Sequence, residues 1–268
     1  MGGEAPMEEW EQAFGVDLRP HLILAGRPDT IRRPSGADQL PPGAHAALSG
    51  AIGRCGLQDL LIVPSAARSC GWLRHRFVYT PPCVLGVGER AAALWVQALP
   101  EPGIRALVPF GEIAAITLHT HGTRRHLLVT GSAGRLPVRY DVADDPVMEG
   151  LIIGLRRRAA GPPAPVPPVA ARYTALLWLD PADELATAGP KTRLIVVTRY
   201  ELVILRPGRV IYVPRSAIQA ASIRSRSLVL RSAGVDLDLG LRSRKTAEAA
   251  ALWLERVSGD HHRSGTGS

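Results

Sequence analysis

The sequence has 268 residues and a net charge of +8, and 46% of its residues are hydrophobic and 21% are charged. These are globular values, and the length is sufficient for two hydrophobic cores, so a largely disordered or fibrous chain is excluded. The longest apolar runs, such as AAALWV at 91–96, are far shorter than the roughly 20 residues that a membrane-spanning helix needs.

The cysteines and the charge distribution limit which cellular environment and which partners are expected for the protein. Cys55, Cys70 and Cys83 form no Cys-x-x-Cys pair and follow no secretory signal, so we expect a reduced, cytoplasmic protein that at most touches a membrane peripherally. Most of the excess positive charge lies in residues 161–268. No aromatic residues are interleaved with these cations, so we expect no nucleic-acid partner.

Residues 1–56 form an N-terminal extension whose fold the sequence leaves uncertain. APMEEWEQAF (5–14) has an amphipathic helical pattern, HLILAG (21–26) is strand-like, and PPGAHAALSGAIGRC (41–55) predicts a helix. Two interpretations stay open: a helical cap on the domain that follows, or a small interaction element.

The rest of the chain contains an internal repeat. Three landmarks recur 105 residues apart, and they are Pro102-Gly103 with Pro207-Gly208, Val108-Pro109 with Val213-Pro214, and Ile113 with Ile218. LVTGSAG (128–134) matches LVLRSAG (228–234) at a spacing of 100, because a hairpin is longer in the first copy. AALWV (92–96) and ELVIL (201–205) correspond as strands. The pattern predicts a tandem duplication.

Each copy is expected to be a run of short antiparallel strands followed by one helix. The Pro-Gly and Ser-Ala-Gly sequences mark hairpins. LPVRYDV (136–142) and VDLDLGL (235–241) alternate as half-buried strands do, which places Asp236 and Asp238 toward solvent. DDPVMEGLIIGLRRR (144–158) and KTAEAAALWLERV (245–257) have the pattern of amphipathic helices.

The first of these helices allows specific expectations. An Asp at 144 is expected at the cap and Pro146 at the first helical position. Val147, Leu151 and Leu155 would form the apolar stripe. The three arginines at 156–158 would lie at the last turn, where the helix dipole favours cations.

GPPAPVPP (161–168) separates the two copies, because its prolines favour an extended, stiff spacer over a helix or a sheet. We therefore expect five segments, which are an N-terminal extension at 1–56, a first domain at 57–160, a Pro-rich linker at 161–170, a second domain at 171–258 and a disordered tail at 259–268.

One phrase of the second copy resembles a known family. VTRYELVIL (197–205), followed by VPRSAI (213–218) and a closing helix, is similar to the bacterial PH-like and GRAM-like domains. The resemblance covers 174–257, and less fully 57–158, where GVGERAAAL replaces the first phrase. It implies an α+β, mainly antiparallel β fold of two PH-like domains, each a curved antiparallel sheet capped by a C-terminal helix.

No catalytic constellation is found along the chain. GVGER (86–90) lies in a strand run, so its glycines are interpreted as structural rather than as a nucleotide loop. His119, His121 and His126 share a hairpin, but Arg124 and Arg125 beside them oppose a cation, so we expect no metal site. Cys70 is interpreted as an idle thiol. We expect no enzyme and no cofactor.

The arginines of the second copy are the candidate ligand site. Arginine pairs with phosphate bidentately, and the amides at a helix start attract anions. The candidate anion-binding residues are Arg206, Arg209, Arg224, Arg226, Arg242, Arg244 and Lys245. The leading hypothesis is a non-enzymatic adaptor that binds a protein partner. The alternative is peripheral binding to an anionic lipid or a phosphorylated ligand through this basic face.

Overall fold

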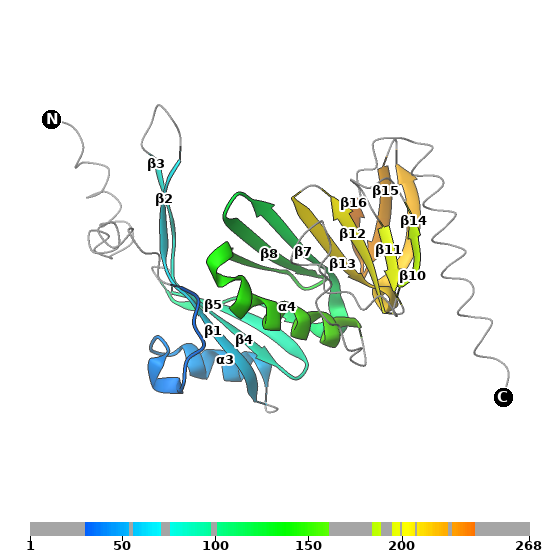
Figure 1. Ribbon diagram of the computed structural model, residues 1–268. Helices are drawn as coiled ribbons and strands as arrows, with labels where there is room; N and C mark the ends of the chain where they lie inside the picture. The colour runs from blue at the N-terminus through cyan, green and yellow to red at the C-terminus, as the bar shows by residue number, and fades with distance from the viewer. Residues whose placement is uncertain are drawn as a thin grey trace. The chain divides into compact units, whose positions relative to one another are not determined.

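The structure is a computed structural model (Figure 1). It describes residues 30–53, 56–70, 76–97, 101–160, 184–188, 195–198, 200–206, 208–224 and 227–238. The chain divides into two compact units, Met1–Leu107 and Val108–Ser268. The described elements are mostly antiparallel strands with few helices, so the expected α+β, mainly antiparallel β class is confirmed at that level.

The first unit contains one helix, one four-stranded sheet and a separate hairpin. The sheet has the order β1-β4-β5-β6, and β2 pairs with β3. The bounds are α3 Ala44–Ile52, β1 Leu57–Val63, β2 Ala66–Cys70, β3 Arg76–Thr80, β4 Cys83–Gly88, β5 Ala91–Val96 and β6 Gly103–Pro109.

Helix α3, the described helix of the N-terminal extension, is packed on strands β4 and β5. This part of the extension is therefore a helical cap rather than a separate interaction element. Leu48 of α3 is fully buried in one apolar cluster with Val84 of β4 and Trp95 of β5. The helix predicted within 41–55 is thus a cap on the first sheet. The patterns predicted at 5–14 and 21–26 lie outside the described residues.

Two glycines of β4 allow this close packing. A Cβ added at Gly86 would lie 3.0 Å from Leu57 Cδ2 and 3.1 Å from Leu48 Cδ2, and one added at Gly88 would overlap Ile52 Cγ2. The structural interpretation of the glycines in GVGER is therefore confirmed.

The second unit contains a seven-stranded sheet, a three-stranded sheet and one described helix. The large sheet has the order β10-β11-β12-β13-β7-β8-β9 and the small one β14-β15-β16. The bounds are β7 Ile113–His121, β8 Arg124–Gly131, β9 Arg135–Asp141, α4 Asp145–Ala160, β10 Glu184–Ala188, β11 Ile195–Thr198, β12 Glu201–Arg206, β13 Arg209–Pro214, β14 Ile218–Arg224, β15 Ser227–Ser232 and β16 Val235–Asp238.

The repeated Val-Pro…Ile phrase has the same local structure in both places. Strands β6 and β13 each end at the proline, a 3-10 turn follows, and β7 and β14 begin at the isoleucine. Each turn carries the chain from one sheet to another. The fixed φ of proline and its missing N–H explain why the strand ends there in both copies.

The predicted hairpins are present, with one exception. Gly208 has a φ of 66°, and Ala233 and Gly234 have φ of 44° and 76°, so both turns of the second copy use left-handed residues. The Ser-Ala-Gly of the first copy joins β8 to β9. The prediction of a turn at Pro102-Gly103 is wrong for its glycine, because Gly103 is the first residue of strand β6 and lacks a positive φ.

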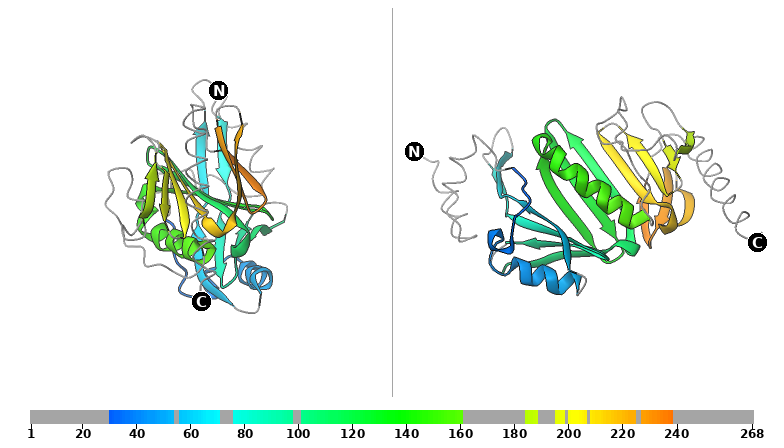
Figure 2. Two further views of the ribbon diagram at one scale, coloured as in Figure 1. Left: turned by 90° about the vertical axis from the view of Figure 1, so that its right-hand side faces the viewer. Right: turned by 60° about the horizontal axis from the view of Figure 1, so that its bottom comes forward.

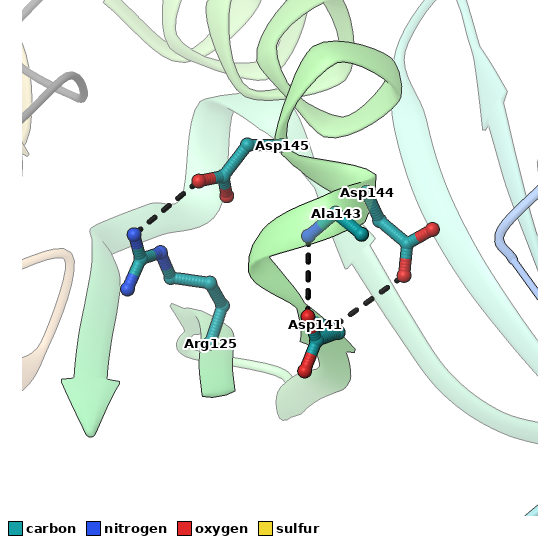
Figure 3. A network of polar contacts seen from close by, with 5 residues as sticks. All are labelled: Arg125, Asp141, Ala143, Asp144 and Asp145. Atoms are coloured by element: carbon teal, nitrogen blue, oxygen red, sulfur yellow. Dashed lines mark hydrogen bonds and ion pairs between the residues drawn. The ribbon is translucent and has the colours of Figure 1, made fainter. Parts of the chain in front are cut away.

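Polar contacts fix the start of α4 (Figure 3). The side chain of Asp141 accepts from the Ala143 amide at 3.2 Å, and Asp144 Oδ2 accepts from the Asp141 amide at 3.4 Å. Arg125 of β8 forms an ion pair with Asp145 at 3.3 Å. Asp141 caps the 3-10 turn Val142–Asp144, and α4 follows that turn directly, beginning at Asp145. Asp144 thus lies immediately before the helix, as predicted, but Pro146 is its second residue rather than its first.

The underside of α4 contains a buried ion pair. Figure 2 shows the helix lying across one face of the large sheet, where Leu151 and Leu155 are buried as predicted. Arg156 Nη2 lies 2.6 Å from Glu201 Oε2 of β12, and its guanidinium is 4.0 Å from the ring centroid of Tyr212 on β13. Of the three arginines predicted at the last turn, Arg157 and Arg158 lie there, whereas Arg156 precedes it and its side chain is only 2% exposed.

Strand pairing joins segments that the sequence assigns to different copies. β13 pairs with β7, with Arg209 opposite His119 and Tyr212 opposite Ile116. The Thr120 amide donates to the Gly208 carbonyl oxygen at 2.7 Å.

The expected linker at 161–170, the second closing helix at 245–257 and the tail at 259–268 lie outside the described residues, and the domain boundaries stay a prediction.

Substitution of Gly88 tests the packing of α3. We expect Gly88→Ala to destabilise the protein by about 1–3 kcal/mol, because the new methyl group overlaps the stiff β-branched side chain of Ile52. Urea unfolding measures the change. Gly111→Ala is the matched control, since a Cβ there meets nothing within 4 Å. Equal stability of the two variants would contradict the observed packing.

Removal of one partner tests the buried ion pair. We expect Glu201→Ala to cost about 3–5 kcal/mol in unfolding free energy, because Arg156 would remain buried without its counter-charge. The double variant Arg156→Met, Glu201→Leu should lose less than the single one. Asp236→Ala removes two exposed ion pairs of the same unit, with Arg224 and Arg231, and is the control. A loss for Glu201→Ala no larger than that of the control would refute the assignment.

Candidate functional site

The structure describes three of the seven basic residues predicted to form the anion site. Arg206 and Arg209 are directly opposite each other at the β12–β13 turn. Arg224 of β14 is paired with Asp236 at 2.9 Å and is 63% exposed, so its charge is already compensated at the surface. Arg226, Arg242, Arg244 and Lys245 lie outside the described residues.

Arg206 and Arg209 belong to a row of basic residues that crosses the large sheet. Successive strands place one member directly opposite the next, because β12 pairs with β13, β13 with β7, β7 with β8, and β8 with β9. Cross-strand partners point to the same face. The members of this cationic row, in spatial order, are Arg206, Arg209, His119, His126 and Arg139.

The cationic row is on the face of the sheet opposite α4. Along β9, Leu136, Val138 and Tyr140 are buried, whereas Pro137 and Arg139 between them are exposed. On β13, Tyr212 contacts Arg156 of the helix, and Arg209, three positions earlier, points to the other face. At the β9 end the row is therefore open to solvent.

Gly208 is required beside the row for two reasons. Its positive φ closes the β12–β13 turn, and a Cβ at this position would lie 2.9 Å from the carbonyl oxygen of Thr120 on β7. Any larger residue would strain the turn and separate β13 from β7. The glycine of the repeated Pro-Gly sequence thus keeps Arg209 next to His119.

The two histidines of the row are held in the neutral form. Their ring centroids are 6.0 Å apart with an interplanar angle of 28°. Burial and then the charge of Arg209 lower the pKa of His119. Burial, followed by the charges of Arg139 and His119, lowers the pKa of His126. At neutral pH the positive charge of the row therefore resides on its three arginines.

Acidic residues near the row are few among the described residues. Burial lowers the pKa of Arg209, and the carboxylate of Asp238 on β16 opposes that shift. One step along the same face, His121, Arg124 and Asp141 form the next row of cross-strand partners. The arginines of this face, which are Arg206, Arg209, Arg124 and Arg139, outnumber the carboxylates Asp141 and Asp238, so among the described residues the face has an excess of cations.

Other chemistry predicted or excluded from the sequence can be located. His119 lies opposite His126 as the hairpin pattern suggested, yet no group of three His, Cys, Asp or Glu side chains in the described part could hold a metal ion. Cys83 is buried, and burial raises its pKa to about 12, so its thiol is not a nucleophile near neutral pH. The side chains of Cys55 and Cys70 are outside the description.

Comparison with models of known protein families and with curated proteins finds no match to this chain. Within the described segments, the helices are too short or too polar to cross a membrane. The function is therefore inferred from the geometry of the cationic row.

Sequence reasoning missed two features of this site. Arg139 was not singled out from the sequence. The alternation of LPVRYDV places it on the polar face of its strand, and the pairing of β8 with β9 brings it opposite His126. The proximity of His119 to Arg209 has no local signal, because 90 residues separate them and the contact depends on the pairing of β7 with β13.

The electrostatic origin of the neutral histidines can be tested directly. We expect Arg209→Ala to raise the pKa of His119, and Arg139→Ala to raise that of His126, because each removes a neighbouring positive charge. Proton NMR titration of the imidazole signals measures both. Arg135→Ala, four residues along β9 from Arg139, is the control. Unchanged histidine titrations in the first two variants would contradict the order of the row.

Proposed function

We propose that this protein is a non-enzymatic adaptor built from two PH-like copies, which binds an acidic segment of a protein partner through the cationic row. The observation that carries the proposal is the direct cross-strand succession of five basic residues on a face that α4 leaves uncovered.

The strand order supports the PH-like part of the proposal. Leaving aside the β2–β3 hairpin, the first copy has four strands in one sheet (β1, β4, β5 and β6), three strands in the next (β7 to β9), and then helix α4. The second copy likewise has four strands in one sheet (β10 to β13) and then three in another (β14 to β16). The predicted helix at 245–257 would close the second copy in the same way. This common order is what two copies of one domain are expected to share.

The dimensions of the row fit an extended peptide. Adjacent strands are about 4.8 Å apart, so the four steps from Arg206 to Arg139 span roughly 19 Å. An extended chain rises about 3.4 Å per residue, so about six residues cover this length. Carboxylates on such a segment could pair with the forked guanidinium group of the exposed Arg139.

A peptide ligand is favoured over a membrane surface by the scarcity of exposed apolar side chains. Among the side chains that the structure describes, Leu107 is the single large hydrophobic one that is exposed, at 36%, and it is not part of the row. Peripheral membrane sites commonly combine cations with apolar side chains that enter the lipid. The row offers charge and hydrogen bonds alone.

Charge reversal on the row tests the proposal. We expect a fluorescent hexa-glutamate peptide to bind the wild-type protein, with an affinity that falls as salt is added. Arg139→Glu combined with Arg209→Glu should weaken binding at least tenfold, measured by fluorescence anisotropy. Arg90→Glu combined with Arg105→Glu makes the same charge change at exposed sites of the first unit, and it is the matched control.

The outcomes separate a specific site from general attraction to a basic protein. Equal weakening in both double variants would contradict the row as the binding site. Co-flotation with phosphatidylserine vesicles, lost in the row variant and without any peptide binding, would replace the proposal by peripheral membrane attachment. If the wild-type protein binds neither probe, the adaptor function through this row is refuted.

A further inference from the structure

His119 and His126 occupy the centre of the cationic row, with Arg209 on one side and Arg139 on the other. Three strand steps separate these two arginines, about 14 Å at the usual spacing. When both imidazoles are neutral, the positive charge of the row is thus divided into two parts. The stacked histidine pair fills the gap between them.

The charged and titratable groups around the pair are mostly basic. Arg209 faces His119 from β13, Arg139 faces His126 from β9, and the two histidines face each other. The flanking groups on the same face are Arg206, His121, Arg124, Asp141 and, from β16, Asp238. Without a ligand, this environment and partial burial keep the pair unprotonated.

An anion placed over the two histidines would favour their protonated forms over the neutral ones. A negative charge within about 4–6 Å favours the charged form of an imidazole, and it also screens the repulsion between two stacked imidazolium rings. His126 Nε2 is buried and has no hydrogen-bond partner among the described residues, so an anion over the row would act on this ring through its charge rather than through a direct hydrogen bond. Ligand and protons would therefore promote each other's binding.

We propose that the cationic row takes up protons on His119 and His126 when its acidic ligand binds, so that the affinity for the ligand rises as the pH falls. This inference rests on the proposed function, because it concerns the same row and the same ligand class. Protonation would convert the divided row into five consecutive cations, which matches a continuous acidic segment.

The test uses the full chain and a peptide whose own charge is constant. A hexapeptide of cysteic acid stays fully ionised, whereas glutamate begins to titrate at the lower end of the range. Its affinity is measured between about pH 7.5 and about pH 5.5, and we expect an increase of up to about tenfold per pH unit for each proton taken up. Calorimetry in two buffers of different ionisation enthalpy counts the protons.

The variant His119→Gln, His126→Gln separates this inference from the proposed function. We expect it to bind the peptide at about pH 7.5 through the arginines, but to show a flat pH dependence and no proton uptake. His45→Gln, at an exposed position of α3, is the matched control and should behave as the wild-type protein does. Circular dichroism verifies that each variant is folded.

The outcomes distinguish proton-coupled binding from the proposed adaptor function. Binding by the wild-type protein that is independent of pH, or a pH dependence that survives in the double glutamine variant, overturns proton-coupled binding and leaves the adaptor function standing. A complete absence of peptide binding across the pH range overturns both.

Discussion

The buried contact between Arg156, Glu201 and Tyr212 is the constraint on which the second unit depends. Burial by itself would lower the pKa of Arg156, but the Glu201 carboxylate and its hydrogen bonds raise it, so the pair stays ionised under the helix. Such a pair contributes little net stability compared with apolar packing, yet separating its members is costly. Its effect is to specify one arrangement: α4, which follows the first copy, is fixed over strands of the second.

This arrangement explains why basic residues that are distant in the sequence gather in one row. With α4 fixed on β12 and β13, strand β13 can continue the sheet into β7, and Gly208 permits the close approach at Thr120. The order of the cationic row then results from the strand pairing, because directly opposite residues on paired strands point to the same face of the sheet. One face of the sheet is thus closed by the helix. The other face is covered along β13, and it carries the cationic row, which is open to solvent at Arg139.

The two copies use equivalent strands in different ways, and the sequence contains the reason. β6 reads GIRALVP, with Arg105 and Leu107 exposed, and it is an edge of its sheet in the described structure. β13 reads RVIYVP, and its residues from Val210 to Pro214 are all buried, as in a strand covered on both faces. The unbroken apolar run of the second copy was therefore an available signal for a central strand. The repeated phrase has the same local structure in both places, while the strands that surround it differ.

The sequence by itself determined the local structure: the Val-Pro turns, the alternating strand β9, the helix α4, the strand glycines Gly86 and Gly88, and the pairing of His119 with His126 across a hairpin. Each depends on residues close in the chain, where proline, glycine and periodicity act directly on the backbone. The burial of Arg156 against Glu201 and the proximity of His119 to Arg209 were decided by tertiary structure alone. Such contacts join residues tens of positions apart, and their free energy depends on which surfaces meet, which no local pattern specifies.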